Sequence, residues 1–342
     1  MRPLLRALDV EVATRAAVAA GLPLVVLLVL GRIDLAAYAS FGGMTALYGR
    51  SEPYRTRLRT VTCAGIGLVV SIAFGASMAA VHAPILVVAV SLLVVITLGM
   101  LAAATFGLFP PTPIFFVFAF TVCSLQPTPT AELGWRILLA IASATFAWLL
   151  VMSGWMLRRT AGVRRPTLFK TLPRRSRYRP AAWRDGRLWL SIAQNLVGVI
   201  VAGWLATLIG AGHSYWAVVS VVAVLPPPRA AHSIARSVHR IVGTALGVVV
   251  TALVLLPGPP PLVVVIVIAL AQFGAEILVG RHYGAALLFI TPLAISVSHL
   301  ATPVPVPQLL LDRVIETALG ASIGLLIVLA TRALDRGRAV RA

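Results

Sequence analysis

Long apolar runs recur along the whole chain and constrain its fold more than any other feature. A membrane-spanning helix needs about 20 apolar residues, because the hydrocarbon core is roughly 30 Å thick. Since lipid offers backbone groups no hydrogen-bond partners, such runs must form helices. The runs predict an all-α membrane protein of about twelve transmembrane helices, at residues 12–31, 34–49, 59–81, 84–107, 112–126, 133–157, 188–210, 213–226, 237–256, 260–279, 283–300 and 309–333.

The composition supports a membrane protein. Hydrophobic residues make up 59% of the 342 residues and charged residues 11%, whereas a soluble domain has about 25% charged residues. The net charge of +19 does not indicate a nucleic-acid partner, because the basic residues lie at the ends of apolar runs and in one central linker, the pattern of membrane topology. Cys63 and Cys123 lie inside apolar runs and are interpreted as packing residues.

The distribution of arginine predicts the orientation. With the N-terminus in the cytoplasm, only Arg32, Arg136 and Arg313 of the 29 Lys and Arg residues lie toward the outside. Because cytoplasmic loops carry the positive charge, we expect a multi-pass protein of the cell (inner or plasma) membrane with both termini cytoplasmic. The predicted parts are a first six-helix repeat, a basic cytoplasmic linker, a second six-helix repeat and a cytoplasmic tail, at 1–157, 158–187, 188–333 and 334–342.

Two short stretches indicate that the halves are similar. Residues 60–67 (TVTCAGIG) parallel residues 240–247 (RIVGTALG), and Trp135-Arg136-Ile137 parallels Asp312-Arg313-Val314 at the start of each final span. Because six is an even number, the halves have the same orientation. They are therefore predicted to be parallel repeats about an axis along the membrane normal.

The linker 158–187 is strongly basic. One interpretation is a patch that binds anionic lipid or nucleic acid. The other, which we prefer, is a cytoplasmic loop that follows the positive-inside rule. Contact with anionic lipid headgroups then follows from its position.

Motifs in the second half resemble the fusaric acid resistance protein-like family, which includes aromatic acid exporters and is related to plant aluminium-activated malate transporters. They are Ser214-Tyr215-Trp216-Ala217-Val218-Val219, Pro226-Pro227, Arg236, residues 240–247 and residues 313–320. The resemblance implies an anionic substrate, aromatic or dicarboxylate. Larger members carry a sizeable cytoplasmic domain where this chain has only the basic linker, and Cys63-Ala64 stands where the second half has Gly243-Thr244.

Arg136 and Arg313 occupy matching positions near the outer end of the last span of each half. Polar groups inside a bilayer are costly and are candidate functional residues. Two guanidinium groups could orient a carboxylate through bidentate hydrogen bonds, or both could extend to the outer interface. Glu316 follows Arg313 by three residues on the same helix face, where it would form an ion pair with Arg313 or take up a proton.

Other polar residues fall within the predicted spans. Arg15, Gln194 and Asn195 could line a polar interior, although Arg15 could instead lie at the cytoplasmic end of its helix. Glu276 and Gln272 share a face of the tenth span. Glu276 is a candidate for proton coupling, and the alternative is an ion pair with Arg281 beside His282.

Four spans are short or interrupted at matching places, namely 34–49 with Gly42-Gly43, 213–226 with Pro226-Pro227-Pro228, 112–126 with Pro113, and 283–300 with Pro292. Such spans indicate a substrate site. Aromatic residues there could contact an aromatic acid, although such residues more often pack or lie at the membrane interface; they are Tyr38, Tyr48, Phe118, Tyr215 and Trp216.

Two pairs of glycines, Gly243 with Gly247 and Gly320 with Gly324, are spaced for close helix packing. The second pair also matches the spacing of a hydrolase nucleophile elbow, but no strand precedes it. Packing is therefore the interpretation.

These observations favour a transporter that exports organic anions. A passive organic-anion channel, a membrane enzyme and an envelope scaffold are the alternatives. An enzyme is not expected, because the ten acidic residues are scattered and no HExxH, Walker A or zinc-ligand spacing is found. We expect no metal and no cofactor; the partners are membrane lipids and a small organic anion, and the sequence is compatible with a homo-oligomer.

Overall fold

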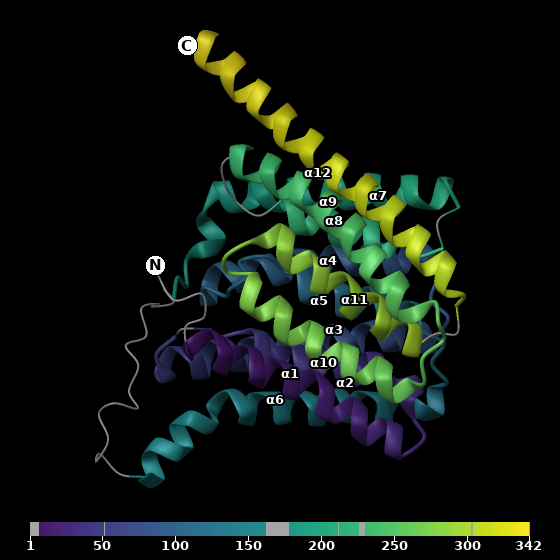
Figure 1. The fold of residues 1–342 in the computed structure, drawn as a ribbon. Helices are drawn as coiled ribbons and strands as arrows, with labels where there is room; N and C mark the ends of the chain where they lie inside the picture. The colour runs from purple at the N-terminus through teal and green to yellow at the C-terminus, as the bar shows by residue number, and fades with distance from the viewer. Residues whose placement is uncertain are drawn as a thin grey trace, which may run out of the picture.

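The computed structural model describes residues 7–50, 52–161, 178–210, 212–225, 230–301 and 304–341. These residues form twelve α-helices and no strand, which confirms the all-helical prediction. The helices run side by side in one bundle (Figure 1). They are α1 (Ala7–Val29), α2 (Ala36–Gly43), α3 (Tyr54–Ala80), α4 (Ile85–Phe106), α5 (Ile114–Leu125), α6 (Leu133–Ala161), α7 (Gly186–Leu208), α8 (Tyr215–Val224), α9 (Ala230–Leu255), α10 (Pro261–Leu278), α11 (Tyr283–Ala301) and α12 (Val306–Arg341).

Nine of the described helices are long and apolar enough to cross a membrane, and the chain is a multi-pass membrane protein. The other three, α2, α5 and α8, have 8, 12 and 10 residues. At about 1.5 Å per residue, none reaches across a hydrocarbon core of roughly 30 Å. All residues of α2 and α8 are buried. Three predicted spans are therefore short helices enclosed by other helices, so twelve full spans are not confirmed.

The long helices pack around the short ones. In the first half α3 packs on α5 and α6, and α2 packs on α6; in the second half α9 packs on α11 and α12, and α8 packs on α12. Between the halves, α1 runs along α10, α2 contacts α11, and α5 contacts α8. Helices α6 and α12 lie at opposite sides of the bundle, and their C-terminal ends project from the same end of it (Figure 1).

The four predicted packing glycines lie where helices approach closely. A Cβ on Gly243 or Gly247 would lie 2.7 Å from the Gly284 carbonyl oxygen or 2.6 Å from that of Leu287, both on α11. Gly320 lies against the Ala217 carbonyl oxygen on α8, and Gly324 against Val224. Any larger side chain at Gly243, Gly247 or Gly320 would force its helix away from the neighbour.

The boundary regions differ from the predicted domain limits. Helix α6 continues to Ala161, and α12 runs without a break to Arg341 through the predicted tail. Residues 162–177, where most of the basic linker falls, and Pro226-Pro227-Pro228 lie outside the described residues. At the described end of the linker, the Arg179 N–H donates to the Thr105 carbonyl at the end of α4, at 2.8 Å.

Candidate functional site

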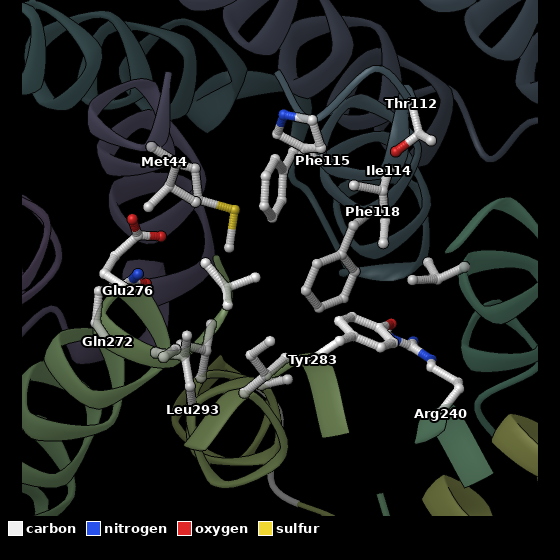
Figure 2. A pocket seen from close by; sticks show the side chains of 18 of the residues that line it. Met44, Thr112, Ile114, Phe115, Phe118, Arg240, Gln272, Glu276, Tyr283 and Leu293 are labelled. Carbon is white, nitrogen blue, oxygen red and sulfur yellow. The ribbon is translucent and has the colours of Figure 1, made fainter. Parts of the chain in front are cut away.

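A cavity of about 140 Å³ lies inside the bundle, between the two halves of the chain. All four spans that were predicted to be short or interrupted contribute to it, through Phe41, Phe118, Trp216 and Leu293 among others. Figure 2 shows Met44, Phe118 and Leu293, from three of these spans, converging on one space. We call it the central cavity.

Aromatic rings form much of the wall of the central cavity. The ring centroids of Phe41 and Phe118 are 4.9 Å apart at an interplanar angle of 80°, and those of Phe118 and Trp216 are 5.1 Å apart. Phe115 and Tyr283 extend this wall. Since rings prefer edge and offset contacts with other rings, the wall suits an aromatic group.

Three arginines also line the cavity, Arg236 and Arg240 from α9 and Arg313 from α12. Its described lining contains one carboxylate, Glu276, which lies with Gln272 on the wall opposite Arg240 (Figure 2). None of the three arginines forms an ion pair with a carboxylate of the described residues. The walls therefore carry an excess of positive charge.

Arg313 is buried, with 1% of its surface exposed, and its guanidinium carbon lies 3.8 Å from the centroid of the Trp216 ring. Its Nε and Nη1 have no hydrogen-bond partner among the described residues. Buried donors without a partner are rare because each costs about 1–3 kcal/mol, and more when charged. The two nitrogens lie on different edges of the guanidinium, so a carboxylate bound in bidentate fashion along either edge, with Nη2, would satisfy one of them and lower this cost.

Arg240 and Arg236 are held by neutral groups. Arg240 donates from Nε and Nη2 to the Ser220 hydroxyl, at 3.4 and 3.3 Å, and from Nη1 to the Tyr283 hydroxyl at 3.3 Å. The Nε of Arg236 donates to the Ala223 carbonyl at 2.5 Å, and its guanidinium lies over the Tyr283 ring. These contacts orient both side chains without neutralising them.

The predicted ion pair between Arg313 and Glu316 is not found, which corrects that expectation. The Glu316 carboxylate instead accepts hydrogen bonds from the N–H groups of His213, at 2.9 Å, and Trp216, at 3.2 Å. Unpaired N–H groups at a helix start favour a negative charge. Glu316 therefore caps α8, while the His213 ring contacts Asp312 at 2.7 Å.

Arg136 is not part of the central cavity. It donates to Glu132 at 3.0 Å, to the Tyr38 hydroxyl at 3.2 Å, and to Thr128 and the Pro127 carbonyl. The structure therefore brings only Arg313, of the two matched arginines, to the cavity. The two guanidinium groups do not form a shared carboxylate site there.

The other predicted polar residues lie away from the central cavity. Arg15 forms an ion pair with Glu11 at 3.0 Å. Gln194 donates to Thr331 on α12, and Asn195 donates to the Leu225 carbonyl at the end of α8. The Arg15 ion pair joins successive turns of α1, and the other two contacts hold helices together.

Glu276 lines the central cavity and pairs with Arg50, at 3.3 Å, rather than with Arg281. Arg50 also bonds the Glu276 carbonyl and Asp9, and Arg281 pairs with Asp9 at 2.6 Å. The alternative ion pair between Glu276 and Arg281 is thus wrong. The four side chains form one network that joins the start of α1 to the end of α10.

Arg236, Arg240 and Tyr283 line the central cavity but are not among the site residues predicted from the sequence. Arg236 and Arg240 belong only to the motifs that carry the family resemblance. The two arginines are four residues apart, so they lie on one face at the start of an apolar helix. That spacing could have indicated that both contribute to one site. Tyr283 carried no comparable signal.

Comparison with known proteins points to one family for the second half. Residues 200–327 match the sequence model of the fusaric acid resistance protein-like family. The uncharacterized membrane protein YvaC of Bacillus subtilis (strain 168) is 28% identical over 138 residues, which are 40% of this chain and 21% of that protein. The uncharacterized protein slr1298 of Synechocystis sp. is 32% identical over 131 residues, 38% of this chain and 17% of that protein.

The chain thus matches about a fifth of the length of these relatives. No solved structure matches it. The predicted resemblance to the fusaric acid resistance protein-like family is confirmed for residues 200–327, which include Arg236, Arg240 and Arg313.

Proposed function

We propose that this protein carries organic anions, above all aromatic carboxylates, across the membrane through the central cavity, in the outward direction. The observation that carries the proposal is Arg313, a buried cation in an aromatic cavity, two of whose nitrogens have no partner in the described part of the chain. A carboxylate supplies the opposite charge and an acceptor for one of these nitrogens. The family match supports a transporter.

The size of the central cavity supports a substrate whose buried part is one ring. An apolar cavity of about 150 Å³ holds one benzene molecule, and this cavity has about 140 Å³. The ring would lie between Phe118 and Trp216 with its carboxylate on Arg313. Arg236 and Arg240 would attract the anion from the α9 side, because like-charged walls focus the field in a cleft.

The proposal includes two parallel six-helix repeats, α1–α6 and α7–α12, in which long helices surround the short helices α2 and α5 in the first and α8 in the second. Corresponding helices have corresponding neighbours, α3 with α5 as α9 with α11, and α2 with α6 as α8 with α12. Both α6 and α12 end on one side of the bundle (Figure 1). The central cavity then lies at the interface of the repeats, where transporters of this type bind substrate.

The orientation in the cell membrane is proposed to have both termini cytoplasmic, with anionic lipid headgroups at the basic linker. Labelling of single cysteines tests it, in a chain whose Cys63 and Cys123 are replaced by alanine. An impermeant thiol reagent added outside should label Thr130→Cys and not Arg184→Cys, both at exposed positions. The reverse pattern would overturn the orientation.

Flux measurements in reconstituted vesicles test the transport proposal. Aromatic monocarboxylates are expected to cross faster than malate-like diacids, and a proton gradient should drive them uphill, with Glu276 as the proton-binding carboxylate. Flux that only follows the substrate gradient would favour a passive channel. Equal permeability of protein-containing and protein-free vesicles to every carboxylate would refute transport, and a membrane enzyme or scaffold would then be the better proposal.

A further inference from the structure

A second hollow, of about 410 Å³, opens on the surface of the bundle between α4 and α7. We call it the lateral groove; its lining comes from α4, α5, α7 and α8 and includes Leu86, Thr121, Ile200, Trp204 and Tyr215. Leu86 is 73% exposed and Trp204 62%. Because the chain spans a membrane, apolar side chains exposed here face the lipid.

The lateral groove marks a difference between the two sides on which the halves meet. On one side α1 runs along α10, and a Cβ on Gly21 would lie 3.0 Å from the Ala269 Cβ. On the other side α4 and α7 touch over a shorter stretch. A Cβ on Gly203 of α7 would meet only Val218, at 3.8 Å. The halves are therefore closed against lipid on the first side and open to it on the second.

The Tyr215 side chain lies against both the lateral groove and the wall of the central cavity. Tyr215 lines the groove, and its ring centroid lies 4.6 Å from that of Trp216 and 6.3 Å from that of Phe118. Trp216 and Phe118 line the central cavity. The Tyr215 hydroxyl is held by the Ser298 hydroxyl at 3.3 Å. The two spaces are therefore adjacent at Tyr215.

We infer that the lateral groove binds the apolar tail of the substrate while its carboxylate binds Arg313. The substrate class is an amphiphilic carboxylate, with a ring at the head and an alkyl tail that reaches past Tyr215. This inference rests on the proposed transport function. The central cavity, at about 140 Å³, has room for one ring only, whereas the groove has about 410 Å³ and is largely apolar. The tail is therefore released toward lipid between α4 and α7.

The test combines a substitution that fills the lateral groove with substrates whose alkyl tails differ in length. Gly203→Leu adds a side chain to the groove from α7. Gly186→Leu is the matched control, because it lies on the same helix with nothing within 4 Å of its Cβ position. The flux of benzoate and of its para-butyl and para-octyl derivatives is measured in vesicles for the wild type and both variants.

Gly203→Leu is expected to leave benzoate flux unchanged and to lower octylbenzoate flux at low substrate concentration. The loss should be about tenfold for every two methylenes excluded from the groove. Gly186→Leu should match the wild type throughout. An equal loss for all three substrates, or no loss for any, would overturn the inference; the groove would then hold a lipid acyl chain or a second copy of the chain.

A binding measurement keeps this inference separable from transport itself. Octylbenzoate brominated at the end of its tail should quench the fluorescence of Trp204, and the quenching should be reduced in Trp204→Phe. Equal quenching in the two proteins would overturn the tail site even if flux proves absent. Absence of all carboxylate flux, with Trp204 quenched, would instead refute the transport proposal and leave the binding site standing.

Discussion

Arg136 and Arg313 stand at comparable places, each near the start of a long helix that packs on a short one. Each guanidinium lies over an aromatic ring of that short helix, Arg136 at 5.3 Å from the Tyr38 centroid and Arg313 at 3.8 Å from that of Trp216. Yet Arg136 donates to four neighbours, whereas Nε and Nη1 of Arg313 have no partner in the described part of the chain. Arg136 therefore stabilises the fold, whereas the guanidinium of Arg313 is available to bind a substrate.

The difference has a local cause. Glu132 lies four residues before Arg136 and pairs with it at 3.0 Å, while the position four residues before Arg313 is Leu309. Three residues after the arginine, α6 has the apolar Leu139 and α12 has the acidic Glu316. The Glu316 carboxylate, however, accepts hydrogen bonds from N–H groups at the start of α8. Arg313 therefore forms no ion pair with a described carboxylate of its own helix.

The largest expected effect is on transport by Arg313→Gln. Two charge-assisted hydrogen bonds to the substrate are lost, and carboxylate flux should fall about 100-fold, because each bond to a charged group contributes about 1.5–3 kcal/mol. Thermal stability should not fall, since an unpaired buried charge is removed. Arg313→Lys should not restore flux, because an ammonium group cannot bind bidentately. Undiminished flux in Arg313→Gln would show that Arg313 does not bind the carboxylate of the substrate.

Arg136→Gln should show the opposite profile. Loss of the hydrogen bonds that join α6 to Tyr38, Thr128 and Pro127 should lower the free energy of unfolding by about 2 kcal/mol. Flux per folded molecule should stay near that of the wild type. Thermal unfolding of the purified protein in detergent measures the first effect and vesicle flux the second. A variant as stable as the wild type but inactive in transport would reverse the roles given to the two arginines.

Leu309→Glu gives Arg313 the carboxylate that Glu132 supplies to Arg136. The internal ion pair would compete with the substrate, so flux should fall about tenfold, equivalent to roughly 1.4 kcal/mol of binding. Leu309→Gln is the control, because it places a polar side chain of the same shape at this buried position without the charge. If the two variants transport equally, neutralisation of Arg313 is not what distinguishes the helices.

The smallest effect is expected for Glu316→Ala. Loss of a side chain that caps the start of a helix costs about 1 kcal/mol, and the midpoint of thermal unfolding should fall by a few degrees. Glu316→Gln keeps an acceptor oxygen for the N–H groups of His213 and Trp216 and should recover most of this loss. A greater loss for Gln than for Ala would contradict the capping role.

Parts of the candidate site could be predicted from the sequence. Trp216, Glu276 and Arg313 stood out as aromatic or charged residues in apolar spans, and all three line the central cavity. Arg15, Gln194 and Asn195 satisfied the same criterion but form contacts that join helices or turns. Polarity inside an apolar run shows that a side chain needs a partner, but not whether that partner is protein or substrate.

The apolar runs alone determined that this protein is a helical membrane protein, because a continuous apolar run satisfies its own backbone hydrogen bonds in lipid only as a helix. Which runs span was decided by the tertiary structure. Residues 215–224 are as apolar as a spanning helix, yet α8 is short and buried on every side, and hydropathy does not distinguish lipid from protein as the neighbour of a side chain. The tertiary structure likewise separated Arg313 from Arg136, because the availability of a charge depends on every group that folding places around it.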